Sequence, residues 1–154
     1  MEGKRCFFIG HRDVGTDIYV RLVEEVEKHI VQYGVREFYV GHYGKFDALA
    51  TQAVAEMKGR YKDVRLILLL PFHPTIRPVE MSAIFYESCF PERQEKVPAR
   101  AAILRANEYM IQKVDFLICY VSHPSSGSRT IMEKAMSRKK RGKIQVTNIA
   151  DCNK

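Results

Sequence analysis

The chain has 154 residues, the length of one ordinary globular domain, and nothing in the sequence divides it. Its composition is 46% hydrophobic and 28% charged, which excludes disordered and fibrous proteins. The longest apolar run, residues 66–70, is far shorter than the roughly 20 residues that cross a bilayer. The N-terminus lacks the apolar region of about 7–15 residues that a secretory signal needs. We therefore expect a cytoplasmic protein that does not insert into a membrane.

The four cysteines are widely spaced and form no Cys-x-x-Cys pair. Cys6 and Cys119 lie within apolar runs, where free cysteine behaves as a small buried hydrophobe. We expect reduced thiols. This spacing does not match a zinc site, and the sequence predicts neither a resident metal ion nor a cofactor.

The formal net charge is +7, and many of the basic residues cluster between Lys134 and Lys143. Such a cluster attracts nucleic acid and other polyanions. Lysine and arginine near the end of a helix also complement the negative pole of its dipole. Both interpretations stay open at this stage.

Short apolar runs alternate with amphipathic segments along the chain, a pattern typical of βα repeats. Residues 5–10 form the first predicted strand, and the periodic apolar residues of 16–33 predict a helix that ends at Gly34. Further strands are predicted at 36–41, 64–70, 115–121 and 143–146, and further helices at 46–57, 99–113 and 130–140.

Helices between successive strands are crossovers, and crossovers imply a parallel sheet with right-handed connections. We predict a single Rossmann-like three-layer α/β/α domain over residues 1–154, with about five strands in the order 3-2-1-4-5. Residues 71–98 hold five prolines and an apolar-aromatic patch. Because a structureless loop of this length is uncommon, we expect a lid-like insertion with a short helix near residues 80–87.

In an open parallel sheet, ligands bind outside the carboxyl ends of the strands, where the strand order reverses. Here that point lies between the first and fourth predicted strands, which are followed by residues 10–16 and 122–130. Residues 124–130 bring backbone amides and hydroxyls to a helix N-terminus, which favours an anion. Gly127 would let a phosphate approach closely, Arg129 adds charge, and Glu133 is expected to point into the same space. Alternatively, Ser128 or Thr130 caps the helix and Glu133 completes a capping box.

Two other segments follow strands. Gly10, His11 and Arg12 leave the first strand, and the planar guanidinium of Arg12 suits a phosphate. His11 is a candidate for ligand contact or acid–base chemistry, although an orienting hydrogen-bond donor is the commoner role. After the second strand come Gly41 and the residues up to Asp47, where Asp47 would bind a sugar hydroxyl or cap the helix.

Together these segments resemble a known family. FFIGHR near the N-terminus, GHYGKFDALA, VPARAAILRANEYMI and DFLICYVSHPSSGSRTIMEKA occur in the order and spacing of the YpsA-like branch of the SLOG (SMF/DprA–LOG) superfamily. The resemblance spans nearly the whole chain and implies a Rossmann-like fold that binds nucleotides or nucleotide-derived ligands. The positions that it marks as ligand-facing are Gly10, His11, Arg12, Gly41, Gly44, Phe46, Asp47, Asn107, Gly127, Ser128, Thr130 and Glu133.

The chain departs from the family pattern at two places. Relatives have Arg-Asn where this chain has Ala106-Asn107, and Arg105 lies about 100° away around the helix. The LOG phosphoribohydrolases have paired glycines where this chain has Ser125 and Ser126.

Three functions follow as hypotheses. The first is a binding or sensing module for a small, phosphate-bearing, nucleotide-type ligand, which aromatic residues of the insertion (Phe85, Tyr86 and Phe90) would cover unless they belong to the core. The second is a LOG-type nucleoside monophosphate phosphoribohydrolase, with Glu133 as the catalytic carboxylate, Asp47 on the ribose, and Arg12 or Ser128 on the phosphate. The third is DprA-like binding of single-stranded DNA, although the basic cluster has no interleaved aromatic residues. The sequence leaves a homo-oligomer open.

Overall fold

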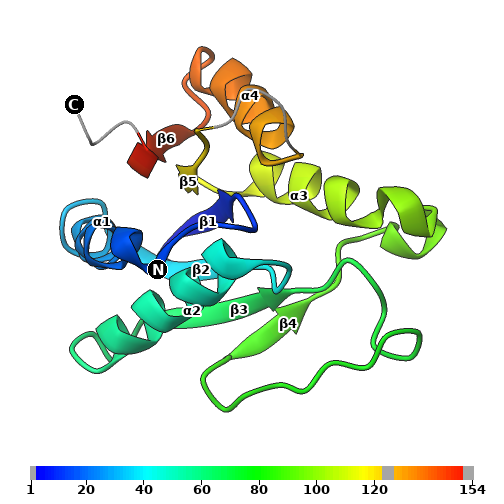
Figure 1. Cartoon of the computed structure of the whole chain (residues 1–154), viewed down its shortest axis with the longest axis horizontal. Helices are drawn as coiled ribbons and strands as arrows, with labels where there is room; N and C mark the ends of the chain where they lie inside the picture. Colours follow the sequence, from blue (N-terminus) through cyan, green and yellow to red (C-terminus); the bar gives the residue numbers. More distant parts are fainter. Residues whose placement is uncertain (1–2, 123–126, 151–154) are drawn as a thin grey trace.

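The computed structural model describes residues 3–122 and 127–150. Within them, six strands form one parallel sheet in the order β4-β3-β2-β1-β5-β6 (Figure 1). This order is that of a Rossmann-like three-layer fold: β1 lies in the centre, the next strands of the chain are added on one side of it, and β5 and β6 are added on the other side. The strands are β1 (Lys4–Gly10), β2 (Val35–Val40), β3 (Arg65–Leu69), β4 (Glu87–Cys89), β5 (Phe116–Tyr120) and β6 (Gln145–Asn148).

Helices cover both faces of the sheet (Figure 1). Side chains alternate along a strand, so Cys6 and Phe8 of β1 face one layer, whereas Phe7 and Ile9 face the other. The first layer contains α1 (Tyr19–Val31) and α2 (Lys45–Lys58), and the second contains α3 (Ala102–Lys113) and α4 (Gly127–Lys139). Burial on both faces explains why the central strands are apolar almost throughout.

Three short 3₁₀ helices complete the elements: η1 (Thr16–Ile18), η2 (Gln94–Lys96) and η3 (Ala99–Ala101). The first leads into α1 and the third into α3, so both helical segments begin where the sequence predicted. Gly34 has φ +74°, the left-handed conformation expected of a glycine after a helix. None of the helices in the described part of the chain is long and apolar enough to cross a membrane.

The predicted strand order is confirmed, with β3-β2-β1-β5-β6 as its five strands and β4 as a sixth at the edge. Two details of the prediction are wrong. No helix forms at residues 80–87; this stretch is irregular and leads into β4. The last helix includes Gly127 and Ser128, three residues before the predicted start.

Backbone hydrogen bonds fix the segment 71–98 along the edge of the sheet. The Tyr86 amide donates to the Leu66 carbonyl at 2.8 Å, and the Leu70 amide donates to the Cys89 carbonyl at 2.8 Å. The Lys58 ammonium at the end of α2 donates to the carbonyl of Ile84 at 2.9 Å. The part of this segment around residues 80–89 is therefore ordered by pairing with β3 and α2 rather than by the helix predicted there, and η2 lies at its end.

Candidate functional site

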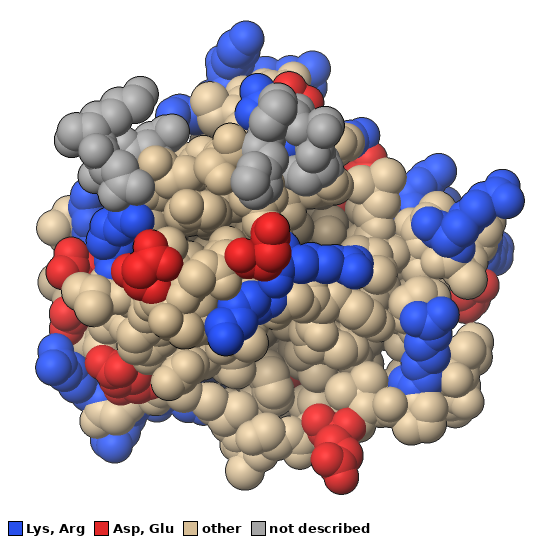
Figure 2. Space-filling view, in the orientation of Figure 1, with Lys and Arg blue, Asp and Glu red and all other residues tan. Residues whose placement is uncertain are grey.

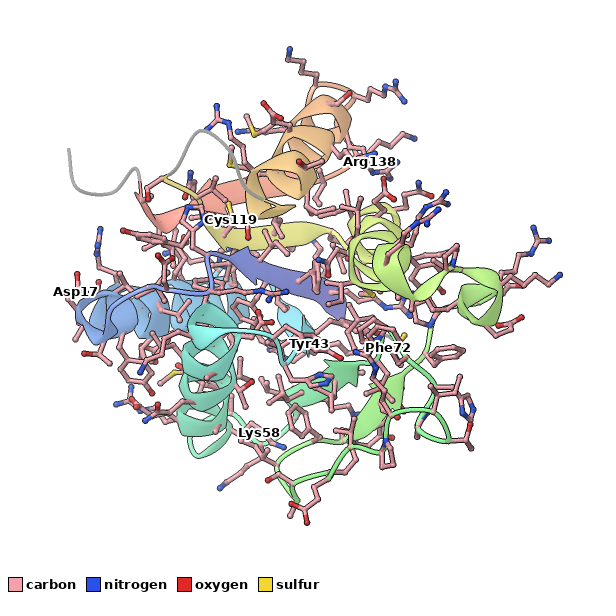
Figure 3. All side chains as sticks on the ribbon, turned by 45° about the vertical axis from the view of Figure 1, so that its right-hand side comes forward. Asp17, Tyr43, Lys58, Phe72, Cys119 and Arg138 are labelled. Atoms are coloured by element: carbon pink, nitrogen blue, oxygen red, sulfur yellow. The ribbon has the colours of Figure 1, made fainter. Side chains whose placement is uncertain are left out.

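A cavity of about 390 Å³ lies at the carboxyl edge of the sheet. Figure 3 brings this edge forward and labels Tyr43, one of the lining residues. The walls come from the ends of β1, β2 and β3, from α3 and from the first turns of α2 and α4. Besides Phe7, Phe8 and Ile9 of β1, the lining residues are Gly10, His11, Arg12, Asp13, Gly41, Tyr43, Asp47, Leu69, Pro71, Ile103, Asn107, Gly127 and Ser128.

The end of β1 has close packing partners on one side of the cavity. A Cβ atom on Gly10 would lie 2.3 Å from Cγ of Phe46, so only glycine fits beneath that ring. His11 is 4% exposed, and its Nε2 atom accepts a hydrogen bond from the Ser122 amide at 2.8 Å. An accepting Nε2 places the proton of the neutral ring on Nδ1. His11 thus orients the chain that leaves β5, as an acceptor rather than as a donor.

The side chain of Ser128 connects the first turn of α4 to β1. The hydroxyl of Ser128 donates to the carbonyl of Gly10 at 2.7 Å. Ser128 lies inside the helix and bonds to another element, so it does not cap α4, and Thr130 lies deeper in the helix. Among the described residues, a Cβ atom on Gly127 would meet no atom within 4 Å outside its chain neighbours and the backbone of its own helix. The cavity therefore meets the backbone of α4 at a residue with open space beside it.

Arg12 lies at the rim of the cavity because the loop after β2 holds its backbone. The amide of Lys45 donates to the carbonyl of Arg12 at 3.0 Å. Gly44 precedes α2 with φ +125°, and a Cβ atom there would lie 2.8 Å from Cα of Arg12. Glycine at this position allows the two loops to approach each other, while the Arg12 side chain is exposed at the rim.

Asp47 is the carboxyl group with the most altered environment in the cavity. Burial raises the pKa of Asp47 to about 7, although a hydrogen bond from the Tyr43 amide and the charge of Arg12 both act to lower it. The Tyr43 amide donates to Oδ2 of Asp47 at 3.2 Å. Near neutral pH this carboxyl group exchanges between its acid and carboxylate forms, so it can donate to or accept from a ligand hydroxyl.

Eight of the predicted site residues share this cavity, and five do not line it. Phe46 is 1% exposed, packs edge-to-face on Phe8 at 6.5 Å, and belongs to the core. The side chain of Glu133 is 64% exposed and lies 3.8 Å from that of Arg129, so it does not point into the cavity as expected. The eight are Gly10, His11, Arg12, Gly41, Asp47, Asn107, Gly127 and Ser128; the five are Gly44, Phe46, Arg129, Thr130 and Glu133.

The residues around the family's Arg-Asn position face different ways. Ala106 is fully buried, and Asn107 lines the cavity. The side chain of Arg105 is 65% exposed and lies 3.7 Å from Glu108, on the side of α3 away from the cavity. Arg105 therefore does not supply a guanidinium to the cavity. The aromatic residues Phe85, Tyr86 and Phe90 do not line it either.

Sequence reasoning missed several lining residues: Asp13, Tyr43, Leu69, Pro71 and Ile103. Four of them adjoin strand ends or predicted residues, so a rule that extends each strand-following segment by one or two positions would have found them. Ile103 lies four residues before Asn107, which puts both on the same face of α3.

Comparisons with known proteins bear on the fold. No family model matches the chain, and no curated protein sequence matches it. Among solved structures, the chain is similar to DNA processing protein A from Helicobacter pylori, a structure that concerns a unique single-stranded DNA binding mode. The two share 15% sequence identity with a TM-score of 0.55, over 97% of this chain and 78% of that one. The chain thus has the Rossmann-like α/β fold of DNA processing protein A.

Proposed function

We propose that this chain binds a small, phosphate-bearing, nucleotide-type ligand in the cavity at the carboxyl edge of the sheet. The observation that carries the proposal is the convergence of Arg12, Asp47 and Gly127 on one cavity of about 390 Å³. Small-molecule sites usually have volumes of about 300–1,000 Å³ and a few polar groups among apolar walls.

The phosphate of such a ligand would lie between Arg12 and the first turn of α4. The amides at the start of a helix have no partners within the helix, and the dipole is positive there. Gly127 leaves open space next to this backbone. Arg12 adds the planar guanidinium that pairs with phosphate oxygens through two donors.

The nucleoside part would extend toward α2 and α3. Asp47 and Asn107 offer hydrogen bonds to ribose hydroxyls or to a base edge. Leu69, Pro71 and Ile103 form an apolar wall against which a base can lie. A lining that combines these polar and apolar groups suits a nucleotide better than it suits a bare anion.

The phosphoribohydrolase hypothesis gains no support from Glu133, because its exposed carboxylate pairs with Arg129 outside the cavity. We therefore propose binding rather than base release. When purified protein is incubated with a panel of nucleoside monophosphates, chromatography should detect no free base. Release of base by the wild type that Glu133→Ala abolishes would restore the catalytic hypothesis.

A thermal-shift screen against nucleoside mono-, di- and triphosphates tests the binding proposal. A ligand at 100 times its dissociation constant adds about 2.7 kcal/mol of stability, which shifts the melting temperature measurably. Arg12→Ala should remove most of the shift, whereas Lys62→Ala, a matched exposed cation after α2, should keep it. A screen without any shift, or a full shift in Arg12→Ala, would contradict the proposal.

A further inference from the structure

The stretch from Lys134 to Lys143, at the end of α4 and just after it, is strongly basic. It contains six lysines and arginines and no aspartate or glutamate. In Figure 2 lysine and arginine side chains project from the top of the molecule, where α4 lies in Figure 1. The carboxyl end of one helix carries only about −0.5 of an elementary charge, so its dipole needs far less positive charge than this. The excess favours an anionic partner.

A cavity of about 410 Å³ lies where this stretch meets the amino edge of the sheet. Its described lining includes three lysines from different elements: Lys4 at the start of β1, Lys139 at the end of α4, and Lys143 just before β6. Gly10, at the other end of β1, lines the cavity of the proposed nucleotide. At about 3.3 Å per residue of strand, Lys4 and Gly10 are about 20 Å apart. This amino-edge cavity is therefore a separate place on the molecule.

The three lysines have no carboxylate partner within residues 3–122 and 127–150, because none of them takes part in an ion pair there. Asp115 is the one carboxylate of the described lining, and its Oδ2 atom accepts a hydrogen bond from the backbone amide of Arg5 at 3.0 Å. Three lysines against one aspartate leave an excess of two positive charges. A hollow lined mainly by one sign of charge concentrates ions of the opposite sign.

Backbone hydrogen bonds fix the positions from which these lysines extend. The amide of Gly142 donates to the carbonyl of Lys139 at 2.9 Å, and the amide of Lys143 donates to that of Arg138 at 3.1 Å. With φ +71° at Gly142, these two bonds form the Schellman motif that ends a helix. Lys4 belongs to β1, which is paired with a strand on either side. The backbone around the cavity is thus ordered before any ligand binds.

We propose that the amino-edge cavity binds a compact anion with two or more linked phosphate groups. Ammonium groups act as point charges that can surround phosphate oxygens, whereas a planar carboxylate is matched best by the fork of an arginine. The described lining contains lysines and no arginine. One phosphate monoester carries about −1.5 to −2 charges, so a chain of phosphates supplies more charge and reaches lysines of separate elements.

Other polyanions suit this lining less well. A single nucleic acid strand needs an open ring on which a base stacks. Phe116, the one aromatic residue of the described lining, is 3% exposed, stacks on Tyr33 at 5.2 Å and has the ammonium of Lys4 5.7 Å from its centre. An anionic membrane needs exposed apolar anchors beside the cations, and the described lining has no exposed large apolar residue. Charge without a stacking surface suits a phosphate chain.

Isothermal titration calorimetry of the full chain with tripolyphosphate, at about 50 mM salt and without divalent cations, tests the proposal. Lys139→Gln/Lys143→Gln should lower the affinity at least about tenfold, since it removes two charged donors. Lys4→Gln, which changes a different element, should lower it about threefold or more. An unchanged affinity in Lys4→Gln would place the anion on the end of α4 instead of in the cavity, and would overturn the proposal.

The matched control is Lys140→Gln/Arg141→Gln. It removes the same charge from the same basic stretch, at exposed positions outside the described lining. The affinity should fall by less than about threefold. An equal loss in the two double variants would show a diffuse attraction and reject the cavity as the site. Binding of orthophosphate or sulfate as tight as that of tripolyphosphate would reject linked phosphates as the ligand.

The charge of the lining can also be raised. Asp115→Asn removes the carboxylate but keeps an oxygen that accepts from the amide of Arg5, so it should tighten tripolyphosphate binding about threefold or more. Weaker binding at an unchanged melting temperature would count against the cavity.

ATP and tripolyphosphate distinguish two sources of the phosphate chain, in an Arg12→Ala background that weakens the proposed nucleotide site. ATP binding that Lys139→Gln/Lys143→Gln removes would identify the phosphate tail of a nucleotide, and binding of tripolyphosphate alone would identify a free polyphosphate. Binding of neither would overturn the proposal. The lysine variants should keep the nucleotide-induced shift of the melting temperature. Wild-type protein that shows this shift but binds no tripolyphosphate would reject the present inference and leave the nucleotide proposal standing.

Discussion

The two walls of the cavity are built differently. The inner wall, defined by Gly10 and Asp47 and backed by Gly44, is packed against the core and against the loop of Arg12: an added Cβ atom would collide with Phe46 at Gly10 and with Arg12 at Gly44. The outer wall, defined by Asn107, Gly127 and Ser128, belongs to α3 and α4, and an added Cβ atom at Gly127 meets nothing within 4 Å.

This difference shows which glycines are evidence for a ligand. Packing alone requires Gly10, and the close approach of two loops requires Gly44, so both would be glycine in a protein that binds nothing. Packing does not require Gly127. Substitutions in the outer wall should therefore change nucleotide binding most clearly, whereas substitutions in the inner wall should change the stability of the protein.

Asp47→Asn should have the largest effect, and the effect should depend on pH. Because burial raises the pKa of Asp47 to about 7, from an ordinary value near 3.8, folding favours the acid form. The stability that the acid form provides is complete below about pH 4, declines as the pH rises, and is lost above about pH 7. Asn cannot ionise, so at pH 8 Asp47→Asn should be more stable than the wild type by up to about 4 kcal/mol.

Urea unfolding of both proteins between pH 4 and pH 8 measures this difference. It should grow with pH up to about 7 and then stay constant. If the stabilities of the wild type and Asp47→Asn changed in parallel with pH, Asp47 would ionise in the folded protein as it does in the unfolded chain. The inner wall would then be more hydrated than its packing indicates.

Gly10→Ala should have the next largest effect. Its methyl group would lie 2.3 Å from the ring of Phe46, which is held between Gly10 and Phe8. Overpacking of this kind costs about 3 kcal/mol, and urea unfolding should show it. The double variant Gly10→Ala/Phe46→Leu removes the ring and should recover part of the loss. If Gly10→Ala were as stable as the wild type, the inner wall would accommodate the extra methyl group without cost. The two walls would then not differ in how tightly they are packed.

Gln94 holds residues 91–98 against Pro71 and the start of α3, and its substitution should have a smaller effect. Gln94→Met preserves the volume but removes the donor to the carbonyls of Pro71 and Ala102, which should lower the free energy of unfolding by about 1–2 kcal/mol. Gln112→Met, at an exposed position of α3, should change it by less than about 0.5 kcal/mol. Equal effects of the two substitutions would mean that residues 91–98 are held by contacts other than those of Gln94.

The fold was largely predictable because apolar runs and helical periodicity are local signals, and the crossover rule then orders the strands. β4 was missed since Glu-Ser-Cys carries no strand pattern; backbone bonds from Tyr86 and Leu70 to their partners create it. A propensity for helix at residues 80–87 is overridden by these tertiary contacts.

The lining of the candidate cavity was predictable where residues follow parallel strands, because the carboxyl ends of those strands meet at one edge. The prediction failed for residues whose direction depends on how their helix is rotated about its axis. Phe46 shares a helical stripe with Ala50 and Ala53, which are fully buried. Glu133 lies two residues from the buried Ile131 and Ala135, so at 100° per residue it projects from the opposite face of α4. Periodicity could have identified both.

Gly127→Ala should have the smallest effect on stability and should discriminate best between the two walls. The new methyl group meets open space, and alanine favours a helix more than glycine does, so stability should rise by about 0.5 kcal/mol. The same methyl group occupies the space where the proposed phosphate would approach the first turn of α4. The melting temperature of the free protein should therefore rise while the shift induced by nucleotides is lost.

Ser137→Ala is the matched control, because it replaces an exposed residue of the same helix away from the cavity. It should stabilise α4 by a similar amount and leave the nucleotide-induced shift unchanged. If Gly127→Ala kept the full shift, the open space at the start of α4 would be a gap without a ligand, and the phosphate would have to bind at Arg12 alone. Opposite signs for stability and binding at one residue are expected only where a ligand, and not the core, occupies the space.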